Sequence, residues 1–379
     1  MTSRKRLWAI HRGEPVDRPA VSFYHLNGYN LLPDEKDPYC VQNDPSWQPL
    51  LKLAKDRTDK IIYRSMQFQN NKRGWSEENR SFTEPDGKRH SIQSLTLGGK
   101  KYQVHYTGTT DASTMWQIEP LMKNADDLRH WLAHYDEPED TPIPDVGDML
   151  QEEESLGDEG IIYIWIGTPL CEVASYFSME DYLIAALTEP ELFHEAVSRV
   201  AKRILRDVRA YAKAMPGKAW STFGPEYATE PYLSPDHFRE YVVKYDQPIV
   251  DAIHESGGVV RLHCHGRVKN VLCDIGDMGY EGLDPVEPPF LGGDITLREA
   301  KKIWKGKFLA GNIEMSDIEL LDESEFSRKV KTALEEGPDE NGGGFILIPT
   351  TFPIDRVITP RVLRNHEIMI EHVENYRPK

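Results

Sequence analysis

The feature that most constrains the fold of this chain is a regular alternation of strand-like and helix-like segments that begins at Gly160. Short runs rich in β-branched residues alternate with longer stretches of helical hydrophobic periodicity. The predicted strands are 161–166, 219–223, 259–263, 282–286, 308–311 and 344–349, and the predicted helices are 190–215, 235–255, 268–277, 297–304, 324–336 and 360–376. Repeated strand–helix units predict parallel strands in one sheet.

The first part of the chain adds two predicted strands, 20–24 and 60–65, and two predicted helices, 3–11 and 46–56. Eight strands with intervening helices favour an α/β fold, a single (β/α)8 TIM barrel over residues 1–379 that begins with an N-terminal helix. An open, doubly wound sheet is less favoured because no GxGxxG motif follows a strand and no P-loop motif occurs. Between about 80 and 118, short alternating segments separated by Gly and Asp turns predict a β-hairpin or meander insertion.

Composition excludes several classes of partner. The chain has 45 Lys and Arg against 62 Asp and Glu, and the resulting net charge of −17 opposes binding to nucleic acid. No apolar run approaches the roughly 20 residues that span a bilayer, and no long apolar segment follows the basic start. We therefore expect a cytoplasmic protein with no membrane partner. Four cysteines form no CxxC pair and are expected to be reduced: Cys40, Cys171, Cys264 and Cys273.

Residues 258–266, GVVRLHCHG, contain the strongest candidate for a chemical site. Side chains alternate along a strand, so His263 and His265 share one face while Cys264 points to the other. Two imidazoles about 7 Å apart along a strand can bind one metal ion, and neutral imidazole suits zinc. The segment His263–His265 alone favours a metal site no more strongly than it favours a pair of core or substrate-binding histidines.

The active site of a TIM barrel lies at the carboxyl ends of its strands. Polar residues that follow the predicted strands are Glu226, His263, His265, Asp284, Glu287, Asn312, Glu314, Thr350 and Thr351. Simpler structural roles remain open for several of them. Asn312 could cap a loop, Glu287 could fix the turn before Pro288, and Asp284 could bond backbone amides.

Several segments carry a resemblance to one family. They are RKRLWAIHRGEPVDRP at 4–19, YLSPDHFREYV at 232–242, HCHG at 263–266, GLDPVEPP at 282–289, AGNIEMSD at 310–317 and FILIPTTFPIDRVITPRVLRN at 345–365. Together they resemble the uroporphyrinogen decarboxylase superfamily. This resemblance implies a (β/α)8 barrel, in agreement with the strand–helix alternation.

Two branches of that superfamily imply different chemistries. True uroporphyrinogen decarboxylases carry an arginine-rich stretch after the first strand, whereas the corresponding segment here, SFYHLNGYN, has no arginine to hold a polycarboxylate. The other branch, the corrinoid-linked methyltransferases, holds zinc through a His-x-Cys-Gly strand end and a cysteine near the last strand. This chain is more similar to the second branch, but His265 replaces the first cysteine and Thr351 stands where the second is expected.

A metal held by the two histidines needs a further ligand, and the best candidate is Glu226 after the preceding strand. Replacing thiolates by nitrogen and oxygen ligands makes the site harder and favours a substrate that presents oxygen, with a thiol acceptor as the second possibility. The resemblance thus implies a metal-dependent methyltransferase or demethylase, with zinc the expected metal, that exchanges a methyl group with a corrinoid (cobalamin-type) cofactor. No corrinoid-binding module is recognisable in this chain, so we expect the corrinoid on a separate partner protein.

Other residues complete the predicted site. Those expected to contact a small-molecule substrate are Tyr24, His25, Tyr29, Asp284, Glu287, Asn312 and Thr351. Asp284 or Glu287 could instead orient a histidine through its second ring nitrogen. Two alternatives remain: a metal-free carboxy-lyase that uses His263 or His265 as acid or base, and a non-catalytic binding barrel.

Overall fold

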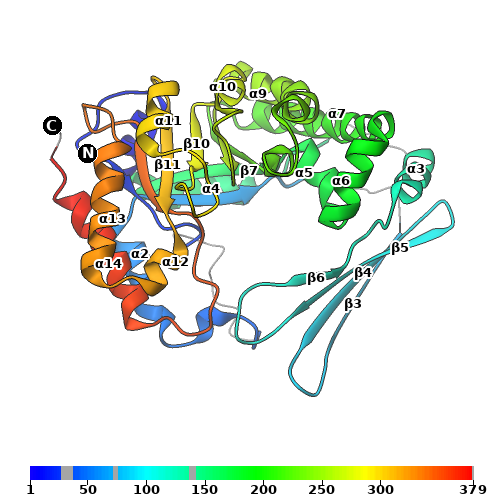
Figure 1. Cartoon of the computed structure of the whole chain (residues 1–379), viewed down its shortest axis with the longest axis horizontal. Coiled ribbons are helices and arrows are strands. Elements are labelled where there is room, and N and C mark those ends of the chain that lie inside the picture. Colours follow the sequence, from blue (N-terminus) through cyan, green and yellow to red (C-terminus); the bar gives the residue numbers. More distant parts are fainter. Residues whose placement is uncertain (27–36, 71–75, 136–141, 378–379) are drawn as a thin grey trace.

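The computed structural model describes residues 1–26, 37–70, 76–135 and 142–377. Eight strands form one sheet in which every neighbouring pair is parallel (Figure 1). They are β1 (Ala20–Val21), β2 (Lys60–Ser65), β7 (Gly160–Gly167), β8 (Ala219–Phe223), β9 (Val259–Cys264), β10 (Gly282–Pro285), β11 (Phe308–Ile313) and β12 (Phe345–Pro349). The order is β1-β12-β11-β10-β9-β8-β7-β2, which confirms the predicted α/β barrel.

The two ends of this order meet. The amide of Asp59, the residue before β2, donates a 2.7 Å hydrogen bond to the carbonyl of Val21 at the end of β1. β1 is shorter than predicted because the chain turns directly after it, with the amide of Leu26 bonded to the carbonyl of Phe23. Polar residues after β1 therefore lie in a loop at the barrel mouth.

Helices surround the strands, as the alternating pattern predicted. Those of the barrel are α1 (Ser3–His11), α2 (Trp47–Arg57), α5 (Pro169–Ser175), α6 (Met179–Thr188), α7 (Pro190–Ala214), α8 (Pro235–Phe238), α9 (Lys244–Glu255), α10 (Leu272–Asp277), α11 (Leu297–Ile303), α12 (Met315–Leu320), α13 (Glu323–Glu336) and α14 (Pro360–Glu374). A π-helical turn, Arg239–Val243, joins α8 to α9, so the helix predicted over 235–255 is continuous. No helix in the described ranges is long and apolar enough to cross a membrane.

Strand alternation divides the core into two layers. The inner layer includes Tyr63, Tyr163 and Phe308, which fill the barrel. The outer layer includes Leu262 and Cys264, which pack between the strands and the helices. Fully burying each large apolar side chain contributes about 1.5–3 kcal/mol, so the packed layers form a rigid support for the strand ends.

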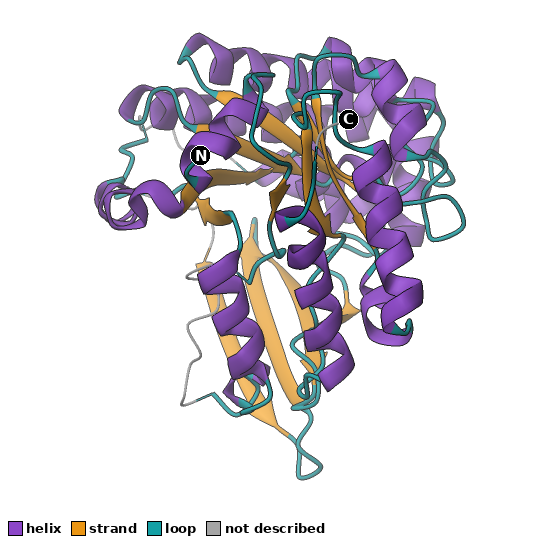
Figure 2. Ribbon diagram, turned by 90° about the vertical axis from the view of Figure 1, so that its left-hand side faces the viewer, coloured by secondary structure: helices purple, strands orange, loops and turns teal. Residues whose placement is uncertain are grey.

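The insertion forms a separate antiparallel sheet that projects from one end of the barrel (Figure 1 and Figure 2). Its strands, in spatial order, are β3 (Ser76–Thr83), β4 (Arg89–Leu97), β5 (Lys100–Gly108) and β6 (Trp116–Glu119). The predicted meander is therefore confirmed, with its first strand four residues earlier than expected. The connection between β5 and β6 pairs with the loop after β12 through Ala112 and Asp355, which attaches the insertion to the barrel mouth.

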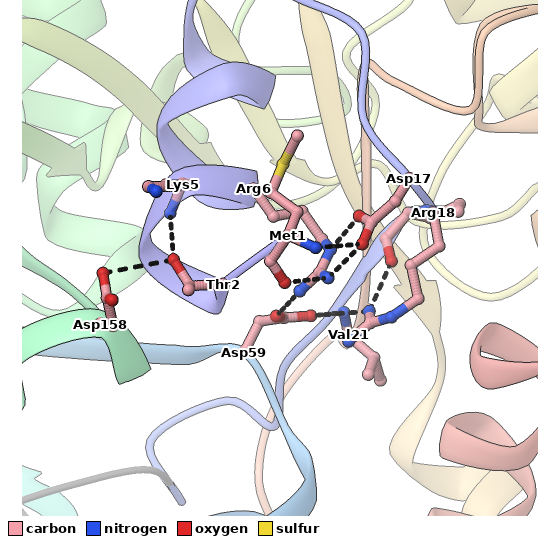
Figure 3. A network of polar contacts seen from close by, with 10 residues as sticks. Met1, Thr2, Lys5, Arg6, Asp17, Arg18, Val21, Asp59 and Asp158 are labelled. Atoms are coloured by element: carbon pink, nitrogen blue, oxygen red, sulfur yellow. Dashed lines mark hydrogen bonds and ion pairs between the residues drawn. The ribbon is translucent and has the colours of Figure 1, made fainter.

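A buried charge network ties the N-terminal segment to Asp59, the residue before β2 (Figure 3). The fully buried carboxylate of Asp59 contacts the guanidinium of Arg6 at 2.5 Å and that of Arg18 at 2.9 Å. Arg6 also pairs with Asp17, whose carboxylate lies 2.8 Å from Nε. The arginines of the opening segment therefore have a structural role, because each buried charge needs an opposite charge beside it.

Candidate active site

The two histidines of the HCHG segment lie together at the end of β9. Their rings are nearly perpendicular, with centroids 4.6 Å apart. His263 is buried at the end of the strand, whereas the side chain of His265 is 37% exposed. Cys264 is buried in the outer layer, and burial raises the pKa of its thiol well above the usual range. The predicted alternation along this strand is therefore confirmed.

Below the histidines, a buried ion pair holds His263. Nδ1 of His263 lies 2.9 Å from Oδ2 of Asp284, its register partner on β10. The other oxygen, Oδ1, lies 2.9 Å from Nε of Arg261, although the N–H is not aligned for a hydrogen bond. Burial alone would raise the pKa of Asp284, but the charges of Arg261 and His263 outweigh it and hold that pKa below its usual value.

Arg261 itself is enclosed by aromatic rings. Its guanidinium lies over the rings of Tyr63 and Tyr163 at 5.5 and 4.7 Å, and Nη2 donates to the hydroxyl of Tyr63 at 3.0 Å. The side chain is fully buried. Arg261 is therefore a fixed positive charge that keeps Asp284 ionised beneath His263.

His265 has a carboxylate partner of its own. Its Nδ1 lies 2.7 Å from Oε1 of Glu287, whose Oε2 accepts a 2.6 Å hydrogen bond from the amide of Gly266. Burial raises the pKa of Glu287, but the hydrogen bonds from His265 and Gly266 outweigh it, so the pKa is lowered. Burial likewise lowers the pKa of His265, and the bond to Glu287 outweighs it, so that pKa is raised.

The turn that carries these two carboxylates is strained. Val286, between Asp284 and Glu287, has a φ of 48°, a conformation that a β-branched residue rarely adopts. It is also buried, and packing holds it in place. The turn directs two nearby carboxylates to two different histidines.

Further carboxylate oxygens at the mouth are buried without a hydrogen bond in the described part of the chain. One is Oε2 of Glu226, in the 3-10 turn Pro225–Ala228 after β8, and another is Oε1 of Glu314, the residue after β11. Oε2 of Glu314 accepts a 3.1 Å hydrogen bond from the hydroxyl of Thr350. Burial and then the charge of Glu287 raise the pKa of Glu314 to about 7. Buried polar atoms need a partner, so each of these oxygens can accept a bond from a water, a proton, an ion or a ligand.

Aromatic side chains line the mouth beside the histidines. The ring of Tyr24 lies 5.5 Å from that of His263 and 4.4 Å from that of His25. His25 has a φ of 54° and also contacts Trp165 and Phe352 at 5.2 and 5.6 Å. Burial, followed by the charge of His263, lowers the pKa of His25 to about 4, so this ring is neutral near pH 7. Tyr29, also predicted to contact substrate, lies outside the described residues.

The remaining predicted residues, Asn312, Thr351 and Asp284, occupy three different positions. Asn312 lines a different cavity, of about 460 Å³, which α11 and α13 also line. Thr351 is half-buried in the loop after β12. Asp284 is fully buried beneath His263, so it contacts the histidine rather than the open mouth.

A second cavity, of about 520 Å³, lies between the insertion and the barrel and does not include the histidines. Its walls include Phe68, Tyr106 and Trp131. Trp165 lines this cavity and also contacts His25, so it borders both the cavity and the barrel mouth.

The two histidines, Glu226, Asp284, Glu287 and Glu314 form one electrostatic cluster. Glu287, Glu226 and Asp284 all act on the pKa of His265, and Glu287 and His265 act on that of Glu314. Within the described ranges, no three His, Cys, Asp or Glu side chains are already arranged as a metal site. The donor chemistry nevertheless fits a divalent cation, because Nδ1 of each histidine is held by a carboxylate and a buried oxygen of Glu226 has no hydrogen-bond partner among the residues that the structure describes.

Sequence reasoning missed Arg261, although a signal was present. A charged residue inside the buried segment GVVRLHCHG must meet an opposite charge, and alternation places it on the same face as His263. Glu314 was recognised only as one of several rim residues.

Comparison with known proteins gives the family. The model of the uroporphyrinogen decarboxylase family matches residues 120–350. The chain belongs to this family. Over 209 residues it is 27% identical to the methylcobamide:CoM methyltransferase MtaA of Methanosarcina barkeri, a match that covers 54% of this chain and 58% of that protein.

Comparison with a solved structure supports the fold. A methyltransferase from Methanosarcina mazei superposes with a TM-score of 0.60 at 18% identity, over 99% of this chain and 98% of that one. The resemblance to the family is thus confirmed, and the similarity to these methyltransferases is consistent with its methyltransferase branch.

Proposed function

We propose that this family member is a metal-dependent methyltransferase or demethylase that moves a methyl group between a small substrate and a corrinoid held on a partner protein. Similarity to methyltransferases, one of which is named for a methylcobamide substrate, supports the reaction class. The observation that carries the metal assignment is the pair of carboxylate–histidine hydrogen bonds. Each of these bonds holds Nδ1 of its histidine, His263 or His265. Nε2 of each ring has no hydrogen-bond partner among the described residues, so it is the nitrogen that could bind a metal.

His263, His265 and Glu226 would hold the ion, for which zinc is the best candidate. When bound, the ion would polarise a substrate oxygen and ease loss of the methyl group attached to it. Asp284 and Glu287 fix the orientation of the two imidazole rings, and Arg261 balances the charge of Asp284. Because none of the three proposed ligands is a thiolate, the site favours a substrate that presents oxygen.

The aromatic wall would bind the body of the substrate. Tyr24 and His25 lie beside His263, and Trp165 and Phe352 extend the same surface. These rings fit a flat or apolar group better than a highly charged one. Tyr29, Asn312 and Thr351 remain proposed substrate contacts.

The direct test is methyl transfer to free cob(I)alamin from small methyl ethers, followed by the absorbance of the methylated corrinoid. Zinc-loaded wild-type protein should turn over, and His263→Ala should not. Cys264→Ala is the matched control, since its side chain lies in the outer layer next to the same histidine. Equal rates in wild type and His263→Ala would refute the proposal.

A metal-free carboxy-lyase is a second candidate. The same carboxylate–histidine bonds that prepare a ring for a metal also prepare it for proton transfer, as in other acid–base sites. Activity on a carboxylated substrate that persists after chelation would favour the lyase. Binding without turnover of either kind of substrate would favour a non-catalytic barrel.

A further inference from the structure

Glu314 lies close to the proposed metal ligands but is not one of them. It follows β11 directly, while His265 follows β9 and Glu287 follows β10, so three neighbouring strands bring these groups to the same end of the barrel. One oxygen of Glu314 is held by the hydroxyl of Thr350, and the amide of Thr350 bonds the carbonyl of Ile313. The carboxyl group is therefore fixed in position by the strand ends of β11 and β12.

The other oxygen, Oε1, is buried and has no hydrogen-bond partner in the described part of the chain. A carboxylate in this position would leave a buried negative charge unpaired near a second one, Glu287. A carboxylic acid would have a proton available for a bound ligand. Two nearby carboxyl groups whose environments shift their pKa values in opposite directions are the usual arrangement of an acid and its ionised partner.

The environments of the two groups do differ. Glu287 accepts hydrogen bonds from His265 and the amide of Gly266, and its pKa is lowered despite burial. In the described part of the chain, Glu314 has one donor, the hydroxyl of Thr350. Burial followed by the charges of Glu287 and Asp317 raises its pKa to about 7, with Thr350 and His265 acting in the opposite direction. Glu287 therefore accepts two hydrogen bonds, whereas Oε1 of Glu314 accepts none from the described residues, so a proton fits on Glu314 better than on Glu287.

We propose that Glu314 is the general acid that protonates the oxygen from which the methyl group departs. This role rests on the proposed methyl transfer. The bond from oxygen to the methyl carbon breaks, and the carbon bonds to the cobalt(I) nucleophile of the corrinoid substrate, which supplies the electron pair. The oxygen keeps the pair of the broken bond and takes the proton of Glu314, whose carboxylate then recovers a proton from water.

The first test does not depend on activity. Infrared difference spectra recorded on either side of about pH 7 should contain the C=O stretch of a protonated carboxylic acid in the wild-type protein. The band should be absent in Glu314→Gln and present in the control Asp317→Asn. Asp317 is a suitable control because it lies close to Glu314 but pairs with Lys329 at 3.1 Å. A band that survives in Glu314→Gln would overturn the proposal.

The second test uses the reaction with cob(I)alamin and two probes, anisole and its para-nitro derivative. A lost general acid costs roughly 10²–10⁴ in rate, and the loss should be larger for anisole because its leaving oxygen is the more basic. We expect Glu314→Gln to keep the wild-type zinc content and to lose the decline in rate that wild type shows as pH rises through about 7.

Equal losses for both probes, or loss of zinc together with activity, would overturn the acid role. A wild-type protein that methylates no corrinoid would overturn the proposed function, and the role of Glu314 with it. The infrared band distinguishes the two failures, because it reports the proton on Glu314 in either case.

Discussion

Replacement of Asp284 by Asn tests the buried charge pair beneath the histidines. Asp284 and Arg261 are both fully buried, and the substitution keeps the shape of the side chain while removing its charge. Loss of one partner from a buried pair costs about 3–5 kcal/mol because the other charge remains buried and uncompensated. Unfolding entropy of about 2.1 cal/mol/K per residue gives about 0.8 kcal/mol/K for 379 residues. The melting temperature should therefore fall by about 4–6 °C.

The assay is thermal unfolding at neutral pH, followed by circular dichroism. Asp56→Asn serves as the control, because Asp56 pairs with Lys52 on the exposed surface of α2 and its loss should leave the melting temperature unchanged. The pKa of Asp284 is lowered in the folded protein, so its contribution is present above the unfolded pKa and is lost as pH falls through the folded value. An Asp284→Asn protein as stable as wild type at neutral pH would refute the charge-pair reasoning.

Three further predictions concern single side chains. Cys264→Val should leave zinc affinity unchanged in a chelator competition, because the thiol lies in the outer layer; a loss equal to that of a histidine variant would contradict the strand register. Glu226→Gln should weaken zinc binding at least about tenfold in the same titration. The control Glu230→Gln should not, because the carboxylate of Glu230 accepts a hydrogen bond from Asn270. Equal zinc affinities of Glu226→Gln and wild type would remove Glu226 from the site. Burial lowers the pKa of His366 to about 4, so between about pH 6.5 and pH 4 the unfolded chain binds more protons than the folded protein, and stability falls as pH drops. His366→Leu should reduce the slope of melting temperature against pH over this range. An unchanged slope would contradict the prediction.

The barrel was predictable because its signal is repetitive. Six strand–helix units after Gly160 and two earlier strands gave the parallel sheet, and the turns near Asp86 and Gly98 gave the meander. Boundaries were less predictable where tertiary contacts decide them. β1 ends after Val21 because the loop that follows folds into the mouth, although its residues suit a longer strand.

The candidate site was predictable where strand period alone was needed. Alternation placed His263 and His265 together and turned Cys264 away. The sequence predicted that Asp284 or Glu287 could orient a histidine, and the structure shows that both do. Which carboxylate meets which histidine was not predicted, since it depends on the left-handed conformation of Val286, which no sequence preference indicates.

The zinc content of the purified protein tests the central claim most directly. Protein expressed with zinc and purified without chelator should contain one zinc ion per chain by mass spectrometry of the elements. His263→Ala should lose the ion while keeping the wild-type circular dichroism spectrum, because the packed strand layers stabilise the barrel. A folded wild-type protein that contains no zinc and takes up none on titration would contradict the proposed metal site.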